Sequence, residues 1–393
     1  MFLQTVSERL IEAAIYILIV WIFIYLAYKV FDLKNKGVEL GPFIVIYKTK
    51  RLSIIEKLSK KYPWAWKIAF SAGIVIGFIG MSQIFIVLLQ NLINFFVAPL
   101  QASPVLPLLP GITISSESLP YIIFGLAVVL LTHEISHGIA ARIEGVKLKS
   151  AGLLLLAILP GAFVEPEEED IKKVSPVARL RIFGAGSFSN IVTSLLILLF
   201  LTNFALVIAP FFGASNGVLI TDVAPGGPSD GILERGDIIY SINGMPTQNV
   251  QELSEILSTV QAFETIELET DEGIIQFKTG ARPDDPTKGY LGVFTFNHYQ
   301  SRIAFLGKFF PVQLFTLLQW TFLLTLNIGL LNLLPILFLD GDRMLTEVVN
   351  YVSQKYNLEI VGKVVLNGIR AFTLMVLLLN IIMTFLNMGL VAI

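Results

Sequence analysis

The stretch PYIIFGLAVVLLTHEISHGIAA, residues 120–141, is an apolar run that contains the motif His-Glu-Ile-Ser-His at 133–137. Helix side chains four residues apart lie on one face. His133 and His137 can therefore bind one zinc ion while Glu134 acts as general base. Ionisable side chains inside an apolar span are energetically costly and are retained mainly at functional sites. The sequence therefore predicts a metal site inside a membrane.

The chain is rich in apolar residues and poor in charged ones. Of its 393 residues, 54% are hydrophobic and 15% are charged, whereas soluble domains carry roughly 25% charged residues. This composition predicts an integral membrane protein. A formal net charge of -2 gives no reason to expect a nucleic-acid partner. The absence of cysteine excludes disulfides, thiolate zinc ligands and cysteine nucleophiles.

Six apolar segments have the length of roughly 20 residues that a membrane-spanning helix needs. They lie at about 10–31, 66–97, 119–143, 188–212, 310–338 and 364–391. The second segment is too long for a simple span. We expect it to tilt or to bend around Gly73, Gly77 and Gly80.

Lysine and arginine are distributed unevenly among the connections between these spans. The first, third and fifth connections are basic, whereas the second, 98–118, contains no lysine or arginine. The positive-inside rule places the three basic connections in the cytoplasm. Both termini and the long fourth connection are then outside. We therefore expect a multi-pass protein of the cell membrane.

Two apolar stretches on the predicted cytoplasmic side are poor helices. GVELGPFIVIYK at 37–48 is short and bounded by Gly, Pro and Lys, and GLLLLAILPGAFV at 152–164 is interrupted by Pro160-Gly161. Each pattern favours a strand or hairpin. Non-helical backbone at membrane depth must be buried in protein or must line a wet cavity. Amphipathic surface hairpins and cavity-lining hairpins both remain open.

The fourth connection changes character. It contains VAPGGP at 223–228, GDIIYSING at 236–244, a helical pattern at 250–260 and short alternating strands at 265–277. This pattern predicts a soluble α+β domain that resembles the PDZ domains of bacterial and archaeal proteases. Such domains bind extended peptides at a sheet edge.

These observations predict a polytopic α-helical membrane protein with about six transmembrane helices. Membrane-associated β-hairpins and an inserted PDZ-like domain complete the expected fold. The expected regions are an N-terminal transmembrane region at 1–212, the PDZ-like domain at 213–300 and a C-terminal transmembrane region at 301–393.

A catalytic zinc usually has three protein ligands and one open position. The remaining histidine, His298, lies at the far end of the predicted PDZ-like domain near the entrance of a span, and we expect it at the surface rather than at the metal. Asp340 is the stronger candidate, because the third and fifth spans both run inward and bring it to the depth of His133. A helix cap is the alternative role for Asp340. Asp342 is a rival ligand that should face elsewhere.

Several motifs together resemble the site-2 protease family of intramembrane zinc metalloproteases. They are HEISH on one span, the PDZ-like insertion, and NLLPILFLDG at 332–341 on a later span. GPF at 41–43, PGAFVE at 160–165 and GSFSN at 186–190 extend the similarity over nearly the whole chain, the last matching the family's GxxxN pattern. The single PDZ-like domain is similar to archaeal or bacterial members.

The resemblance implies that His133, His137 and Asp340 hold a zinc ion (Zn2+) and that Glu134 is the general base. It also implies that the partners are transmembrane segments of membrane proteins whose outer part has already been shortened. The PDZ-like domain would then filter substrates by size or dock them.

The same resemblance assigns less central roles to two asparagines. Asn190 would help to hold the substrate or the oxyanion, and Asn332 would support the site. The chain departs from the family at Asp342-Arg343, where members often have a second glycine after LDG.

A substrate helix must unwind before cleavage, and we expect the stretch from Gly152 to Ile158 to be a sheet edge that captures it.

Two other functions are compatible with parts of this sequence. A membrane zinc protease of soluble or lipid-modified termini would take its third ligand from a downstream glutamate. The only acidic run near the motif is 165–170, which Pro166 disrupts. A PDZ-bearing membrane scaffold with a structural zinc would not need Glu134, so the presence of Glu134 favours an enzyme.

Overall fold

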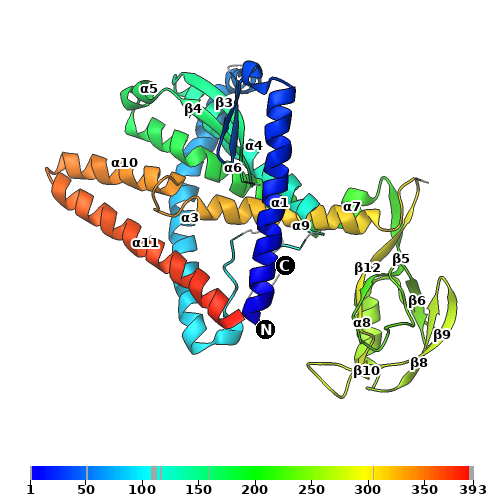
Figure 1. Ribbon diagram of the computed structural model, residues 1–393. Helices are drawn as coiled ribbons and strands as arrows, with labels where there is room; N and C mark the ends of the chain where they lie inside the picture. Colours follow the sequence, from blue (N-terminus) through cyan, green and yellow to red (C-terminus); the bar gives the residue numbers. More distant parts are fainter. Residues whose placement is uncertain are drawn as a thin grey trace. The chain divides into compact units, whose positions relative to one another are not determined.

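A computed structural model describes residues 2–49, 52–107, 113–115, 117–157, 159–303 and 305–388. The chain divides into two compact units. The first consists of residues up to 198 together with residues from 319 onward, and the second consists of 199–318. Elements are labelled as in Figure 1.

The first unit is built mainly from helices (Figure 1). The long ones are α1 (Phe2–Val30), α3 (Pro63–Val97), α4 (Leu119–Ile143), α6 (Pro176–Thr202), α9 (Phe310–Leu331) and α11 (Glu359–Met388). The shorter ones are η1 (Leu33–Lys36), α2 (Ser53–Lys60), η2 (Pro99–Gln101), α5 (Glu168–Lys173) and α10 (Asp340–Lys355).

The long helices agree with the predicted spans. Among the described residues, α3, α4, α6, α9 and α11 are long and apolar enough to cross a membrane. The remaining predicted span corresponds to α1, whose part Ile17–Val30 is a shorter apolar helix. The protein is therefore a multi-pass membrane protein, as its composition predicts.

The helix predicted at 188–212 lies earlier in the chain, because α6 runs from Pro176 to Thr202. Its first turns carry arginines, and Arg179 forms an ion pair with Glu347 of α10 at 2.6 Å. A hydropathy pattern does not include this polar first turn in the helix, because the residue that stabilises it, Glu347, is distant in sequence. The stretch 203–212 instead forms a short helix and the start of a strand.

The glycines of α3 are sites of close packing within one uninterrupted helix. A Cβ at Gly73 would lie 2.9 Å from the ring of Phe188, and one at Gly77 would lie 2.8 Å from Cε of Met344. A Cβ at Gly80 would lie 2.7 Å from Leu333. The missing side chains let α3 approach α6 and the start of α10.

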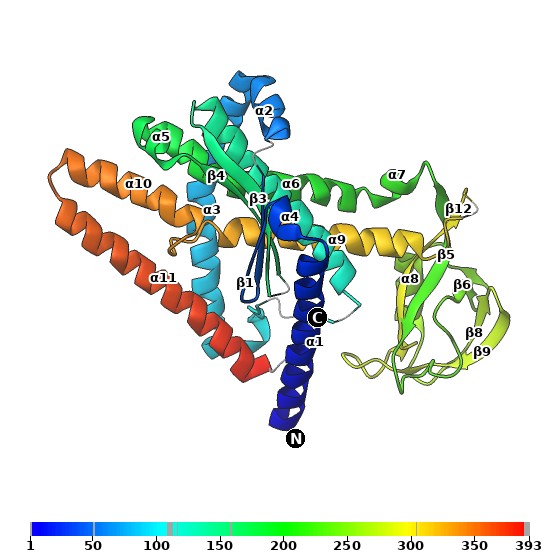
Figure 2. The ribbon, with the colours of Figure 1, turned by 45° about the horizontal axis from the view of Figure 1, so that its top comes forward.

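The two predicted hairpins join into one antiparallel sheet of order β1-β2-β3-β4 (Figure 2). The first hairpin consists of β1 (Val38–Gly41) and β2 (Ile44–Thr49). The second consists of β3 (Leu148–Leu156) and β4 (Leu159–Pro166). Both strand predictions are confirmed.

The predicted sheet edge at Gly152–Ile158 is wrong. Residues 152–156 belong to β3, which pairs with β2 on one side and with β4 on the other, and Ile158 lies outside the described residues. The pattern of one hairpin cannot show that a second, distant hairpin covers it. The edge beside α4 is β4 instead.

In the second unit the described strands pair antiparallel, and two short helices accompany them. Its elements are α7 (Phe204–Ile208), β5 (Phe212–Val223), β6 (Ile238–Ile242), β7 (Met245–Pro246), α8 (Val250–Thr259), β8 (Thr265–Thr270), β9 (Gly273–Lys278), β10 (Gly280–Ala281), β11 (Gly289–Tyr290) and β12 (Val293–Ser301). The main sheet has the order β12-β5-β6-β8-β9. Its first and last strands are therefore neighbours, which suits a unit inserted into a longer chain.

This unit has its own apolar core, centred on side chains such as Ile220, Ile239 and Leu268. It extends beyond the expected 213–300, because α7 and the residues after β12 pack around Phe212. His298 of β12 is buried, with Nδ1 2.8 Å from Oδ1 of Asn216. The expectation that His298 is a surface residue is therefore wrong.

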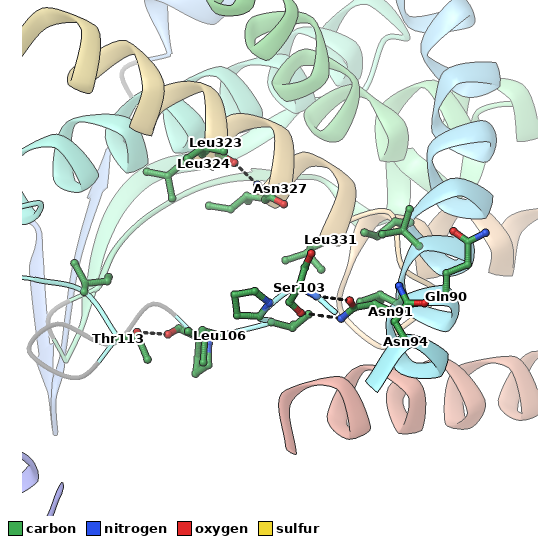
Figure 3. A pocket seen from close by; sticks show the side chains of 18 of the residues that line it. Gln90, Asn91, Asn94, Ser103, Leu106, Thr113, Leu323, Leu324, Asn327 and Leu331 are labelled. Carbon is green, nitrogen blue, oxygen red and sulfur yellow. Dashed lines mark hydrogen bonds between the residues drawn. The ribbon is translucent and has the colours of Figure 1, made fainter. Parts of the chain in front are cut away.

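In the first unit, polar side chains of α3 and α11 bind the backbone of an extended segment. Asn91 of α3 donates to the carbonyl of Ser103 at 2.9 Å and accepts from its N–H at 2.7 Å (Figure 3). Thr384 of α11 accepts from the N–H of Val105 at 3.0 Å. These contacts satisfy backbone groups that no helix or strand pairs. The segment lines a cavity of about 610 Å³.

Candidate metal centre

The three predicted ligands lie together. His133 and His137 project from α4, and Asp340 is the first residue of α10. The Nε2 atoms of the two histidines each lie 3.3 Å from an Asp340 carboxylate oxygen and 3.1 Å from each other. All the ligand atoms lie within 4.8 Å of one another. Two imidazole nitrogens and one carboxylate oxygen form a donor set that suits zinc.

Backbone and side-chain acceptors orient both imidazoles. Nδ1 of His137 lies 2.7 Å from the carbonyl oxygen of Ile182, so it carries the ring proton and leaves Nε2 free. Nδ1 of His133 lies 3.2 Å from Nδ2 of Asn190, and Oδ1 of Asn190 accepts a hydrogen bond from Oγ1 of Thr132 at 2.9 Å. When Nε2 of His133 binds a metal, Nδ1 carries the ring proton, and a rotation of the Asn190 amide by 180° would then bring its oxygen to the ring.

Asn190 is fully buried and is not among the residues that line the cavity at the ligands. Its amide contacts His133 rather than the space where a substrate would lie. This placement corresponds to a residue that orients a ligand. The GxxxN pattern indicates the position of Asn190 but not its neighbour, because the contact joins two helices, α4 and α6.

Asp340 begins α10, directly after the connection 332–339 from α9. The N–H of Gly341 donates to the carbonyl of Asn332 at 2.8 Å, and a Cβ at residue 341 would collide with the carbonyl of Leu333. Asn332 thus supports the site through its main chain. Ser187 of α6 donates to Oδ2 of Asp340 at 2.8 Å. The connection also explains why the helix predicted at 310–338 ends at Leu331.

Gly186 leaves space in front of the ligands. A Cβ at this position would lie 2.6 Å from Nε2 of His133 and would also collide with Nε2 of His137. No side chain larger than hydrogen fits without displacing a ligand. The open space and the donor set together fit a resident metal ion. Gly186 belongs to the GSFSN pattern, and the pattern alone does not reveal this contact with α4.

Glu134 stands beside the ligand group. Its Oε2 accepts a hydrogen bond from the N–H of Val164 in β4 at 2.8 Å. Glu134, the ligands and residues 163–166 of β4 line a cavity of about 670 Å³. The cavity-lining interpretation is therefore confirmed for the second hairpin. The first hairpin reaches the site only through its pairing with β3.

The competing ligands lie elsewhere. Asp342 faces away from the histidines and forms an ion pair with Arg370 of α11 at 2.5 Å. His298 belongs to the second unit. The acidic run at 165–170 ends β4 and forms α5, and it contributes nothing to the ligand group found among the described residues.

An HExxH helix, a buried aspartate beside its two histidines and several apolar spans are together typical of a membrane zinc metalloprotease. The protein-family model described as Peptidase family M50 matches residues 121–377. The chain therefore belongs to this family, the site-2 proteases. The resemblance seen in the sequence is confirmed.

Individual relatives are distant. An uncharacterised protein of Methanocaldococcus jannaschii is 27% identical over 86% of both chains. The membrane-bound transcription factor site-2 protease homolog of Arabidopsis thaliana is 26% identical over 60% of this chain and 45% of its own. A putative zinc metalloprotease of Clostridium perfringens is 28% identical over 32% of this chain and 43% of its own. The chain thus spans less than half of the last two.

Among solved structures, the PDZ domain of an SdrC-like protein from Listeria monocytogenes is similar to part of the chain. It is 23% identical and covers 20% of this chain and 87% of its own, with a TM-score of 0.19.

Proposed function

We propose that this zinc metalloprotease cleaves transmembrane segments of membrane proteins inside the bilayer. The observation that carries the proposal is the place of Glu134. It lies in an apolar span, outside the ligand group, with its carboxylate held by β4 beside the cavity. A structural zinc site in a scaffold would need only the ligands. A protease of soluble termini would not need its centre within a span.

The proposed chemistry divides between the metal and the chain. Bound zinc would lower the pKa of a water molecule and would polarise the scissile carbonyl. Glu134 takes the proton of that water and later passes it to the leaving amine. The hydrogen bond from Val164 holds the carboxylate in position for both transfers. Asn190, Ile182 and Ser187 fix the three ligands.

The proposed substrate strand pairs with β4, whose outward residues follow from the sheet register. Lys48 donates to the carbonyl of Gly37, so these two residues form a hydrogen-bonded pair. Counting across the register, Ala162 and Val164 direct their backbone groups away from β3. The bond from Val164 to Glu134 agrees with this count.

Two prolines limit the length of this edge. Pro160 is another outward position by the same count, and Pro166 ends the strand. Neither has an N–H to offer. Because the N–H of Val164 is bonded to Glu134, the outward N–H of Ala162 is the donor that β4 can give to an extended substrate.

Ala162→Pro removes that donor while leaving the pairing of β4 with β3 intact. We expect cleavage of a transmembrane helix to fall about tenfold, the effect of roughly one lost hydrogen bond, and cleavage of a short extended peptide to fall much less. Initial rates with both substrates provide the measurement. Leu40→Pro, at an outward position of the opposite edge strand β1, is the control. Equal losses for both substrates would rule out pairing at this edge.

We further propose that the metal centre opens toward the cytoplasm and that the unit inserted near 213–300 lies outside. The distribution of lysine and arginine supports this orientation. On the outside, the PDZ-like unit would admit only substrates whose outer part has been shortened.

One experiment tests the function, the orientation and the filter. The wild-type protein should cut a tagged single-span substrate within its span when the outer part is short, and a zinc chelator should stop the reaction. A variant lacking 213–300 should also cut substrates with a large folded outer domain. If the PDZ-like unit lies outside, a large folded domain on the cytoplasmic side of the substrate should not change the effect of the deletion on cleavage. Cleavage outside the span would contradict the proposed function, and unchanged selectivity would contradict the filter.

A further inference from the structure

The turn that presents Asp340 is attached to α11 through a second carboxylate. Asp342 is buried and accepts two hydrogen bonds from Arg370, from Nε at 2.5 Å and from Nη2 at 2.8 Å. Arg370 also donates to Thr346 at 2.9 Å and to Asn367 at 3.2 Å. The planar guanidinium thus binds the carboxylate in a two-pronged geometry that fixes orientation as well as distance.

Asp340 and Asp342 hold the first turn of α10 from opposite sides. Successive helix residues are rotated by about 100°, so side chains two positions apart point in nearly opposite directions. Asp340 faces the histidines of α4, and Asp342 faces Arg370 of α11. Gly341 between them is pressed against the carbonyl of Leu333. A shift of the turn toward or away from α11 therefore changes the position of Asp340 relative to the histidines.

We propose that Arg370 is a positioning residue of the metal centre. Its ion pair with Asp342 fixes the first turn of α10 and thereby the place of the Asp340 carboxylate. The inference rests on the proposed zinc site.

The chain offers a matched control on the same helix. Glu347 of α10 forms an ion pair with Arg179 of α6 at 2.6 Å, with side-chain exposures of 14% and 22%. The corresponding values for Asp342 and Arg370 are 7% and 21%. Breaking either pair therefore removes a similar ion pair between α10 and another helix. Only the pair of Asp342 and Arg370 includes a residue of the helical turn that begins with Asp340.

The test measures zinc affinity in the purified full-length protein by competition with a chromophoric chelator. Thermal unfolding of the zinc-free protein is measured alongside. Arg370→Gln and Asp342→Asn should weaken zinc binding by about 10–100-fold, the range for residues that support metal ligands. Arg370→Lys should restore only part of the affinity, because an ammonium cannot make the two-pronged contact. Glu347→Gln should lower the unfolding temperature similarly but leave zinc affinity near the wild-type value.

The outcomes separate this inference from the proposed function. Equal zinc affinities for Arg370→Gln and Glu347→Gln, in a wild-type background that binds zinc, would overturn the positioning role alone. A wild-type protein without zinc affinity would overturn the proposed metal site as well. If the single variants do not fold, Asp342→Gly combined with Arg370→Leu leaves no unpaired buried charge. Weakened zinc binding in this double variant supports the proposal, and wild-type binding overturns it.

Discussion

Glu134→Gln should retain zinc and lose cleavage by roughly 10²–10⁴-fold, the usual contribution of a positioned general base. The amide keeps the shape of the side chain and still has an oxygen to accept the hydrogen bond from Val164. It cannot take a proton from water. Because Glu134 is not one of the three ligands, metal binding should not change. Zinc content and the cleavage rate of a tagged single-span substrate are the two measurements.

Glu165→Gln is the matched control for this variant. Glu165 also lines the cavity but accepts a hydrogen bond from Ser150 at 2.8 Å within the sheet. Its neutralisation should leave cleavage close to wild type. Undiminished cleavage by Glu134→Gln would show that another group removes the proton, and simultaneous loss of zinc would show that Glu134 supports the ligands instead.

Gly186→Ala should abolish stable zinc binding, although it adds one methyl group. The new Cβ would lie 2.6 Å from Nε2 of His133 and would also meet His137, so at least one ligand must move. Changes in residues that only support ligands already weaken metal affinity by about 10–100-fold, and we expect a larger loss here. Chelator competition gives the affinity, and cleavage should disappear with the metal.

Gly368→Ala controls for the general effect of alanine in a long helix. Gly368 lies in α11, and a Cβ there would have no neighbour within 4 Å. Alanine favours helix over glycine, so this variant should be at least as stable as wild type and should bind zinc normally. Equal zinc affinity for the two alanine variants would mean that the space in front of Gly186 is not used by the metal.

Local patterns predicted the elements of this protein well. The spacing of His133 and His137 depends only on helix geometry, so it could be read from five residues. The two hairpins were recognisable because Pro and Gly interrupt short apolar runs. Span boundaries were less accurate where a polar turn belongs to the helix, as at Arg179, whose partner Glu347 lies far away in sequence.

Contacts between distant segments could not be predicted in the same way. The edge of the sheet was misplaced because β2 covers β3. The neighbour of Asn190 was unknown because it lies on another helix. His298 was expected at the surface, yet Asn216 on β5 pairs with it in a buried position.

By itself the sequence determined that this is a membrane-spanning protein with an HExxH metal motif and an aspartate available as third ligand. Hydropathy and helical periodicity depend on residues that are close in sequence, so they can be recognised from the sequence alone. The tertiary structure decided which strand edge faces Glu134, why Gly186 must lack a side chain, and how Arg370 holds the turn of Asp340. These features depend on packing between α4, α6, α10, α11 and the sheet, and packing is set by the shape of all the contacting surfaces together.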